Sequence, residues 1–195
     1  PEETVAYQIS VQAVPELADK TLLALTMPMT KDKALLNENY DRAAEKIADQ
    51  LDQGKNVVFL TLGDPTVYST YMYVHQRLEE KGYRVEIISG ITSFCAVAAR
   101  VNMSLVERSE PLHVIPASYQ IEDALKLSGT KVLMKAGKKM KDVKAELLSQ
   151  GAEAMMIENC GMPDEKIYRT VEEIPEDAGY YSLIIIKENK DRREE

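Results

Sequence analysis

The sequence has no tryptophan and only two phenylalanines, two histidines and two cysteines among 195 residues. Cys95 and Cys160 lie far apart and form no Cys-x-x-Cys pair, which argues against a zinc site or a disulfide framework. Such sparse cysteine suits a reducing cytoplasm. No apolar run reaches about 18 residues, so we expect no membrane span. The sequence does not open with a signal peptide, which would show a positively charged stretch followed by an apolar one, so we do not expect secretion.

Negative charge predominates, with 32 Asp and Glu against 24 Lys and Arg and a formal net charge of -8. An acidic protein repels phosphate backbones, so we expect no general binding to nucleic acid. One cluster of lysines runs against this balance and is either a basic patch or, more ordinarily, a solvated helix face; it comprises Lys131, Lys135, Lys138, Lys139, Lys141 and Lys144.

Several motifs of catalysis and cofactor binding are missing. The sequence has no Gly-x-Gly-x-x-Gly fingerprint, no P-loop and no Gly-x-Ser-x-Gly elbow. His75 falls in an expected helix and His113 in an expected strand, and we interpret both as structural. An enzyme built from this chain would therefore act by positioning its reactants rather than through a strong base.

The first part of the chain alternates between helical and strand patterns. Apolar spacing predicts helices over residues 3–14, 33–53, 68–81 and 94–101, with Gly54 and Gly82 as stop signals. Short apolar runs predict strands at 22–26, 57–61 and 85–89. This alternation with tight turns is typical of an open parallel α/β sheet, in which ligands bind beyond the carboxyl ends of the strands.

A second unit of the same class is expected from residue 112 onward. Strand patterns occupy 112–116, 130–135, 153–158 and 181–187, and helical patterns occupy 120–128 and 140–149. We therefore predict an α/β protein with two lobes, 1–111 and 112–195. The charged tail, 188–195, is expected to fray.

Two turns follow expected strands and could carry chemistry. The first contains Gly63 and Asp64, followed by Pro65, and the second contains Thr92 and Ser93. Each turn has an ordinary interpretation as a helix cap, since Asp, Ser and Thr accept from the first backbone amides of a helix. Each turn also has a functional interpretation, in which amides and hydroxyls at a sheet edge hold a small polar ligand.

Six segments resemble the tetrapyrrole methylases, and within them the precorrin-2 C-20 methyltransferases. The longest reads Val-Val-Phe-Leu-Thr-Leu-Gly-Asp-Pro-Thr-Val-Tyr-Ser-Thr-Tyr-Met-Tyr-Val over 57–74. Its second half and the Pro-Met-Thr-Lys segment are similar to the C-20 branch specifically, whereas Gly-Asp-Pro and Gly-Ile-Thr-Ser mark the wider superfamily. The other segments are 27–32, 89–96, 133–136, 157–159 and 181–185.

The resemblance implies a fold, a cofactor and a site. It implies two α/β lobes with the active site in the cleft between them, a homodimer, and S-adenosylmethionine as methyl donor. Carried over by position, the donor contacts are Leu62, Gly63, Asp64, Val67, Thr92, Ser93, Lys135 or Ala136, Asn159 and Ser182. The family also opens with a strand and a Gly-x-Gly-Pro-Gly-Asp-Pro loop that would precede Pro1, and a chain lacking them would have a damaged tetrapyrrole site.

The implied reaction is methyl transfer to carbon 20 of precorrin-2 or its cobalt form, with no metal held by the protein. Tyr68, Tyr71 or a water molecule could remove the carbon-20 proton, and the sequence does not choose among them. Two alternatives belong to other classes. One is a methylase of the same fold acting on ribosomal RNA or a translation factor, and the other is a non-catalytic ligand-binding module.

Overall fold

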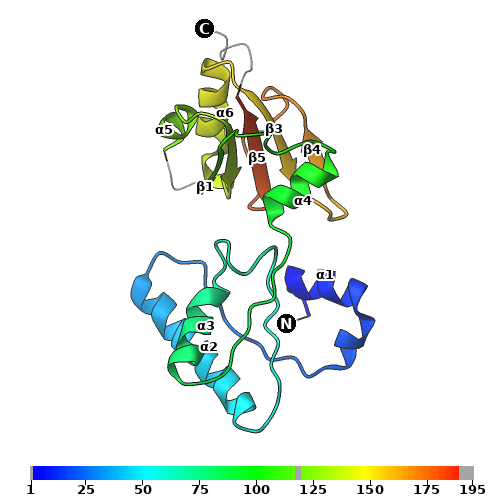
Figure 1. The fold of residues 1–195 in the computed structure, drawn as a ribbon, viewed down its shortest axis with the longest axis vertical. Coiled ribbons are helices and arrows are strands. Elements are labelled where there is room, and N and C mark those ends of the chain that lie inside the picture. The colour runs from blue at the N-terminus through cyan, green and yellow to red at the C-terminus, as the bar shows by residue number, and fades with distance from the viewer. Residues whose placement is uncertain (1, 117–119, 189–195) are drawn as a thin grey trace. The chain divides into compact units, whose positions relative to one another are not determined.

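The computed structural model describes residues 2–116 and 120–188. The chain divides into two compact units, Pro1–Thr92 and Ser93–Glu195 (Figure 1). The sequence placed this division at 111/112 instead. Helix α4 (Ser93–Arg100) falls in the second unit because Val97 is buried against Leu183 and Ile185 of that unit. No helix within the described residues is long and apolar enough to cross a membrane.

The first unit is built on helices. They are α1 (Val5–Ala13), the 3-10 helix η1 (Pro15–Asp19), α2 (Lys33–Leu51) and α3 (Tyr71–Glu80). Asp32 caps α2 by accepting from the amides of Ala34 and Leu35, and Gly54 turns the chain after it at a φ of 76°. Helices α2 and α3 share a buried cluster that includes Ala44, Ile47 and Val74.

The three strands predicted in this unit are not formed. Residues 22–26, 57–61 and 85–89, all of them described, carry no ladder hydrogen bonds. One side of these segments is still buried, because Val57, Phe59 and Val85 pack against the α2–α3 cluster. On the other side Val58 and Ile88 are 79% and 81% exposed. The prediction was wrong because a short apolar run indicates that a segment contributes to the core, whereas a strand also needs a hydrogen-bonded neighbour.

The second unit contains a mixed five-stranded sheet with the order β1-β2-β5-β3-β4. Strands β1 and β2 are parallel, while β5 runs antiparallel to both β2 and β3. Strand β4 fell in a stretch that the sequence left irregular, and it pairs antiparallel with β3. The strands are β1 (Leu112–Pro116), β2 (Thr130–Met134), β3 (Glu153–Glu158), β4 (Lys166–Tyr168) and β5 (Ser182–Lys187).

Helices cover both faces of this sheet (Figure 1). On one face Leu133 and Ile184 join Met140 and Leu147 of α6 (Met140–Ser149), with α5 (Ile121–Leu125) beside them. On the other face Val132 and Ile185 join Val97 of α4. The 3-10 turn η2 (Gly137–Lys139) connects β2 to α6. The α/β class predicted from the sequence is confirmed, with the regular sheet in the second unit.

Candidate functional site

The two turns predicted to bind a ligand are joined by one carboxylate. Asp64, which is 8% exposed, accepts hydrogen bonds through Oδ2 from the amide of Gly90 at 3.0 Å and the hydroxyl of Ser89 at 3.1 Å. Its Oδ1 accepts from the amide and the hydroxyl of Thr66 within its own turn. These bonds, led by the Thr66 hydroxyl, lower the pKa of Asp64 from 3.8 to about 2. The side chain is therefore committed to holding the turns together.

Backbone packing holds the same two turns at close range. A Cβ added to Gly90 would lie 2.1 Å from the carbonyl oxygen of Gly63, so no side chain fits there. Gly63 itself has a φ of 69°, a conformation that glycine adopts at little cost. Both glycines thus serve the contact between the turns. The sequence placed the two turns at strand ends, and although those strands are not formed, the turns lie side by side.

Residues after the first turn do not start a helix directly. Helix α3 begins at Tyr71, with Thr70 as its N-cap, so Asp64 and Pro65 do not cap it as the ordinary interpretation proposed. Between them the chain turns through Tyr68 at a φ of 52°, and Ser69 shares a hydrogen bond of 3.2 Å with Thr61. Leu62 and Tyr68 are exposed, at 38% and 51%, and Val67 is half-buried.

Thr92 carries an unsatisfied polar atom. Its Oγ1 is buried and has no hydrogen-bond partner among the described residues. The neighbouring Ser93 is exposed and is the first residue of α4. A buried hydroxyl without a partner costs about 1–3 kcal/mol, so such groups call for a physical explanation. A polar ligand group at this position would supply the missing partner.

The other predicted contacts gather at one edge of the sheet in the second unit. Strands β2 and β3 both end there, and β5 begins between them. Lys135 follows β2 at a φ of 61°, and Asn159 follows β3 at a φ of 53°. The backbone N–H of Asn159 donates to the carbonyl of Tyr181 at 3.1 Å. The structure thus brings the second-unit residues of the prediction together.

Two of those residues, Ala136 and Ser182, are buried. Ala136 is 1% exposed, and it lies at a cavity of about 510 Å³ whose lining includes Pro116, Leu133 and Lys139. Ser182 is 4% exposed and donates its hydroxyl to the carbonyl of Gly179 at 2.9 Å. Ser182 therefore supports the loop before β5 rather than presenting a free hydroxyl.

The lysine cluster of the sequence is not one surface. Lys131 is 4% exposed, and burial lowers its pKa. Lys144 donates to the backbone carbonyls of Glu172 and Ile174. Lys135, Lys139 and Lys141 are exposed. Neither interpretation of the whole run is correct, because it crosses β2, a turn and α6.

A row of three polar side chains on α3 was missed. The Tyr71 hydroxyl lies 3.2 Å from Nδ1 of His75, and Nε2 of His75 lies 3.4 Å from a carboxylate oxygen of the exposed Glu79. His75 is 6% exposed, and Phe59 packs on the Tyr71 ring with centroids 4.9 Å apart. Burial, followed by the charge of Glu79, raises the pKa of Tyr71. The spacing of four residues between the three side chains was the available signal.

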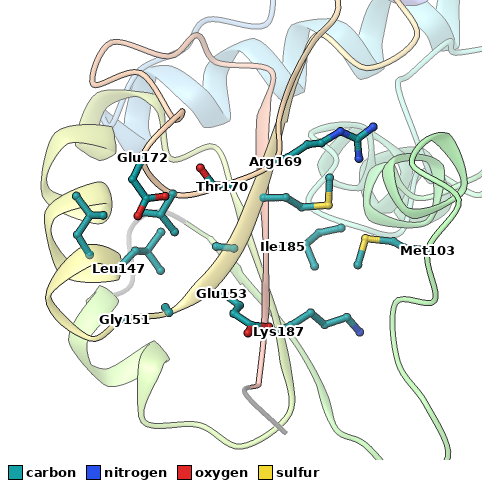
Figure 2. A pocket seen from close by; sticks show the side chains of 14 residues that line it. Met103, Leu147, Gly151, Glu153, Arg169, Thr170, Glu172, Ile185 and Lys187 are labelled. Carbon is teal, nitrogen blue, oxygen red and sulfur yellow. The ribbon is translucent and has the colours of Figure 1, made fainter. Parts of the chain in front are cut away.

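A cavity of about 500 Å³ lies elsewhere in the second unit, at the start of β3 (Figure 2). Gly151, Glu153, Arg169, Ile185 and Lys187 are among its lining residues. It contains none of the predicted contacts, because β3 begins at Glu153 whereas the predicted edge lies beyond its other end.

Comparison with known proteins decides the family. The sequence profile of the tetrapyrrole (corrin/porphyrin) methylases matches residues 4–175. The chain belongs to the tetrapyrrole methylase family. A probable cobalt-precorrin-2 C(20)-methyltransferase of Methanocaldococcus jannaschii is 34% identical over 194 residues, covering 96% of this chain and 80% of the relative. The chain is therefore a methyltransferase, as the resemblance implied.

Other members of the family match over most of their length. A cobalt-precorrin-2 C(20)-methyltransferase of Salmonella typhimurium is 32% identical and covers 82% of this chain and 70% of the relative. A precorrin-2 C(20)-methyltransferase of Sinorhizobium is 29% identical, with 91% and 76% covered.

Solved structures show the same fold. A cobalt-precorrin-4 methyltransferase of cobalamin biosynthesis has a TM-score of 0.66 at 22% identity, with 76% of this chain and 70% of that chain covered. A uroporphyrin-III C-methyltransferase of Thermus thermophilus, complexed with S-adenosylhomocysteine, has a TM-score of 0.58 at 21% identity, with 81% and 74% covered.

Proposed function

We propose that this tetrapyrrole methylase transfers a methyl group from S-adenosylmethionine to carbon 20 of precorrin-2 or its cobalt form, in cobalamin biosynthesis. The observation that carries the proposal is the 34% identity to a probable cobalt-precorrin-2 C(20)-methyltransferase over 96% of the chain. Two further relatives at 32% and 29% identity carry the same C(20) designation.

The two joined turns fit the polar part of the proposed donor. Gly63 offers backbone beside the exposed Leu62, and Thr92 offers a buried hydroxyl that lacks a partner. Ser93, which is exposed, and Asn159, which is half-buried, are the remaining candidates. Asp64 acts indirectly, because its carboxylate positions the turns rather than facing a ligand. The donor would supply an activated methyl group.

Positioning supplies the catalysis in this proposal. Holding the reacting carbons in line removes an entropic barrier that can reach several kcal/mol. Tyr71 is the favoured candidate for receiving the carbon-20 proton, because its own hydroxyl proton can pass to Nδ1 of His75, 3.2 Å away. The raised pKa of Tyr71 keeps the phenol protonated, so the two proton movements would have to be concerted.

In this proposal the cobalt form of precorrin-2 is the favoured substrate. The active species is a homodimer, as the family resemblance implies. Two relatives with identities above 30% are named for cobalt-precorrin-2, and a relative named for precorrin-2 without cobalt is 29% identical. Turnover of the two substrates should be compared directly, and faster turnover of metal-free precorrin-2 would reverse this assignment. Sedimentation of the purified protein tests the dimer.

Incubation with S-adenosylmethionine and each tetrapyrrole, followed by mass spectrometry, tests the function. The proposal predicts one added methyl group on the tetrapyrrole and one equivalent of S-adenosylhomocysteine. Ribosomal RNA and translation factors should remain unlabelled, since the net charge of -8 opposes RNA binding. Submicromolar, salt-sensitive binding to ribosomal RNA together with its methylation would favour the first alternative. Donor binding without any methyl transfer would favour a non-catalytic module.

A further inference from the structure

The loop before β5 presents two exposed tyrosines beside a lysine. Tyr180 and Tyr181 are 46% and 43% exposed, and their ring centroids are 5.3 Å apart with planes at 81°. The Lys135 ammonium lies over the Tyr180 ring, 5.7 Å from its centroid. These three side chains, here named the tyrosine–lysine platform, combine an aromatic surface with a cation. They fit a flat, apolar ligand that carries acidic groups.

Three contacts fix the loop that carries the two tyrosines of the platform. The amide of Gly179 donates to a carboxylate oxygen of Glu158 at 2.5 Å. The backbone N–H of Asn159 donates to the carbonyl of Tyr181. A Cβ on Gly137 would lie 2.7 Å from the carbonyl oxygen of Gly179, so the turn after β2 also packs directly on this loop. The aromatic pair therefore stands on a fixed base, which lowers the entropy cost of binding.

Among the described residues Lys135 forms no ion pair, and its ammonium lies over the Tyr180 ring. In a protein with a net charge of -8, an exposed lysine that lies over a tyrosine ring attracts an anion to that position on the surface.

We infer that the tyrosine–lysine platform binds the tetrapyrrole itself, with Lys135 contacting a carboxylate on the rim of the macrocycle and the tyrosines contacting its apolar edge. This inference rests on the proposed function and names Lys135 and Tyr180 as its substrate-binding residues. It also reassigns Lys135, which the resemblance had placed against the methyl donor. The macrocycle matches both parts of the surface, because its acetate and propionate side chains surround an apolar ring system.

Equilibrium binding of uroporphyrin III to the full chain tests the inference without requiring turnover. This stable tetrapyrrole carries the same kinds of acidic side chain, and its absorbance and fluorescence report binding. Lys135→Met should weaken binding roughly tenfold and reduce its salt dependence, since one charge-assisted contact is lost. Tyr180→Leu should also weaken binding, and Tyr180→Phe should retain most of it.

Lys141→Met is the matched control. Lys141 is an exposed lysine in the same unit, so the variant changes net charge equally and should bind uroporphyrin III as the wild type does. Affinity for S-adenosylhomocysteine, measured by calorimetry, should be unchanged in Lys135→Met. Wild-type uroporphyrin affinity in Lys135→Met would overturn the inference, and so would a selective loss of donor affinity.

The proposed function fails independently of this result. It fails when the wild type binds uroporphyrin III through the platform but adds no methyl group to precorrin-2. Conversely, a wild type that methylates precorrin-2 while Lys135→Met and Tyr180→Leu leave tetrapyrrole affinity and KM unchanged would overturn only the platform.

Discussion

The Asp64 carboxylate accepts a hydrogen bond from the backbone amide of Gly90 at 3.0 Å, and this bond connects two turns whose residues are 26 apart in the chain. The same carboxylate accepts hydrogen bonds from the Ser89 hydroxyl and from the backbone amide and the hydroxyl of Thr66. A side chain at this position determines whether the two turns present their backbone and hydroxyl groups as one surface.

Replacing Asp64 by alanine should therefore affect both folding and donor binding. We expect the melting temperature to fall by a few degrees, and donor affinity in the folded fraction to fall about tenfold because the turns separate. Ser89→Ala removes a single bond and serves as the mild control. Thermal melting and calorimetry with S-adenosylhomocysteine should be run on one sample. Unchanged donor affinity in folded Asp64→Ala would separate the Asp64 contact from the donor site.

The depressed pKa of Asp64 predicts an acid-dependent loss of stability. Its pKa is about 2 in the folded chain against an ordinary 3.8, so folding favours the ionised form. That contribution is fully present above pH 3.8 and disappears as the pH falls toward 2. The difference in melting temperature between wild type and Asp64→Asn should shrink over this window. A difference that stays constant down to pH 2 would contradict this role of the carboxylate.

Thr92 offers a test in which stability and binding move in opposite directions. Thr92→Val keeps the side-chain shape and removes the unpartnered hydroxyl, so the melting temperature should stay equal or rise. If the hydroxyl contacts the donor, affinity should fall roughly tenfold. Melting and donor calorimetry measure both effects. A variant with wild-type donor affinity would show that the hydroxyl has no ligand.

Ser93→Asp probes the next residue by adding charge and bulk. Ser93 is exposed at the first position of α4, where a carboxylate interacts favourably with the helix N-terminus, so the fold should be retained. Donor affinity should fall at least about tenfold, because the adenosyl group would lie against this turn. A stable Ser93→Asp protein with wild-type affinity would show that the turn is structural.

Local signals predicted much of the fold. Helix α2 was predicted from its apolar spacing and from Gly54 as its stop signal, and Gly54 turns the chain after it. Strand β4 spans three residues, too few for a pattern, and its pairing with β3 depends on the turn between them. In residues 57–61 the apolar run correctly predicted that the segment packs on the core. It could not show whether a neighbouring strand was available for hydrogen bonding.

The site was predictable to a similar extent. Proximity of the two turns followed from their places after apolar segments, whereas the direct bond from Asp64 to Gly90 joins residues distant in sequence. The Tyr71–His75 contact was within reach through its helical spacing. The exposure of Tyr180 and Tyr181 could not be predicted from the sequence. Both residues precede a strongly apolar strand, and their exposure depends on how Gly137 and Gly179 pack.

Carbon-13 labelling of the transferred methyl group tests the central claim most directly. The full chain is incubated with S-adenosylmethionine labelled at its methyl carbon, together with cobalt-precorrin-2 or precorrin-2, and the product is examined by NMR. The account predicts a single enriched methyl group bonded to carbon 20. Enrichment at any other carbon of the macrocycle, or no enrichment while the donor is bound, would contradict it.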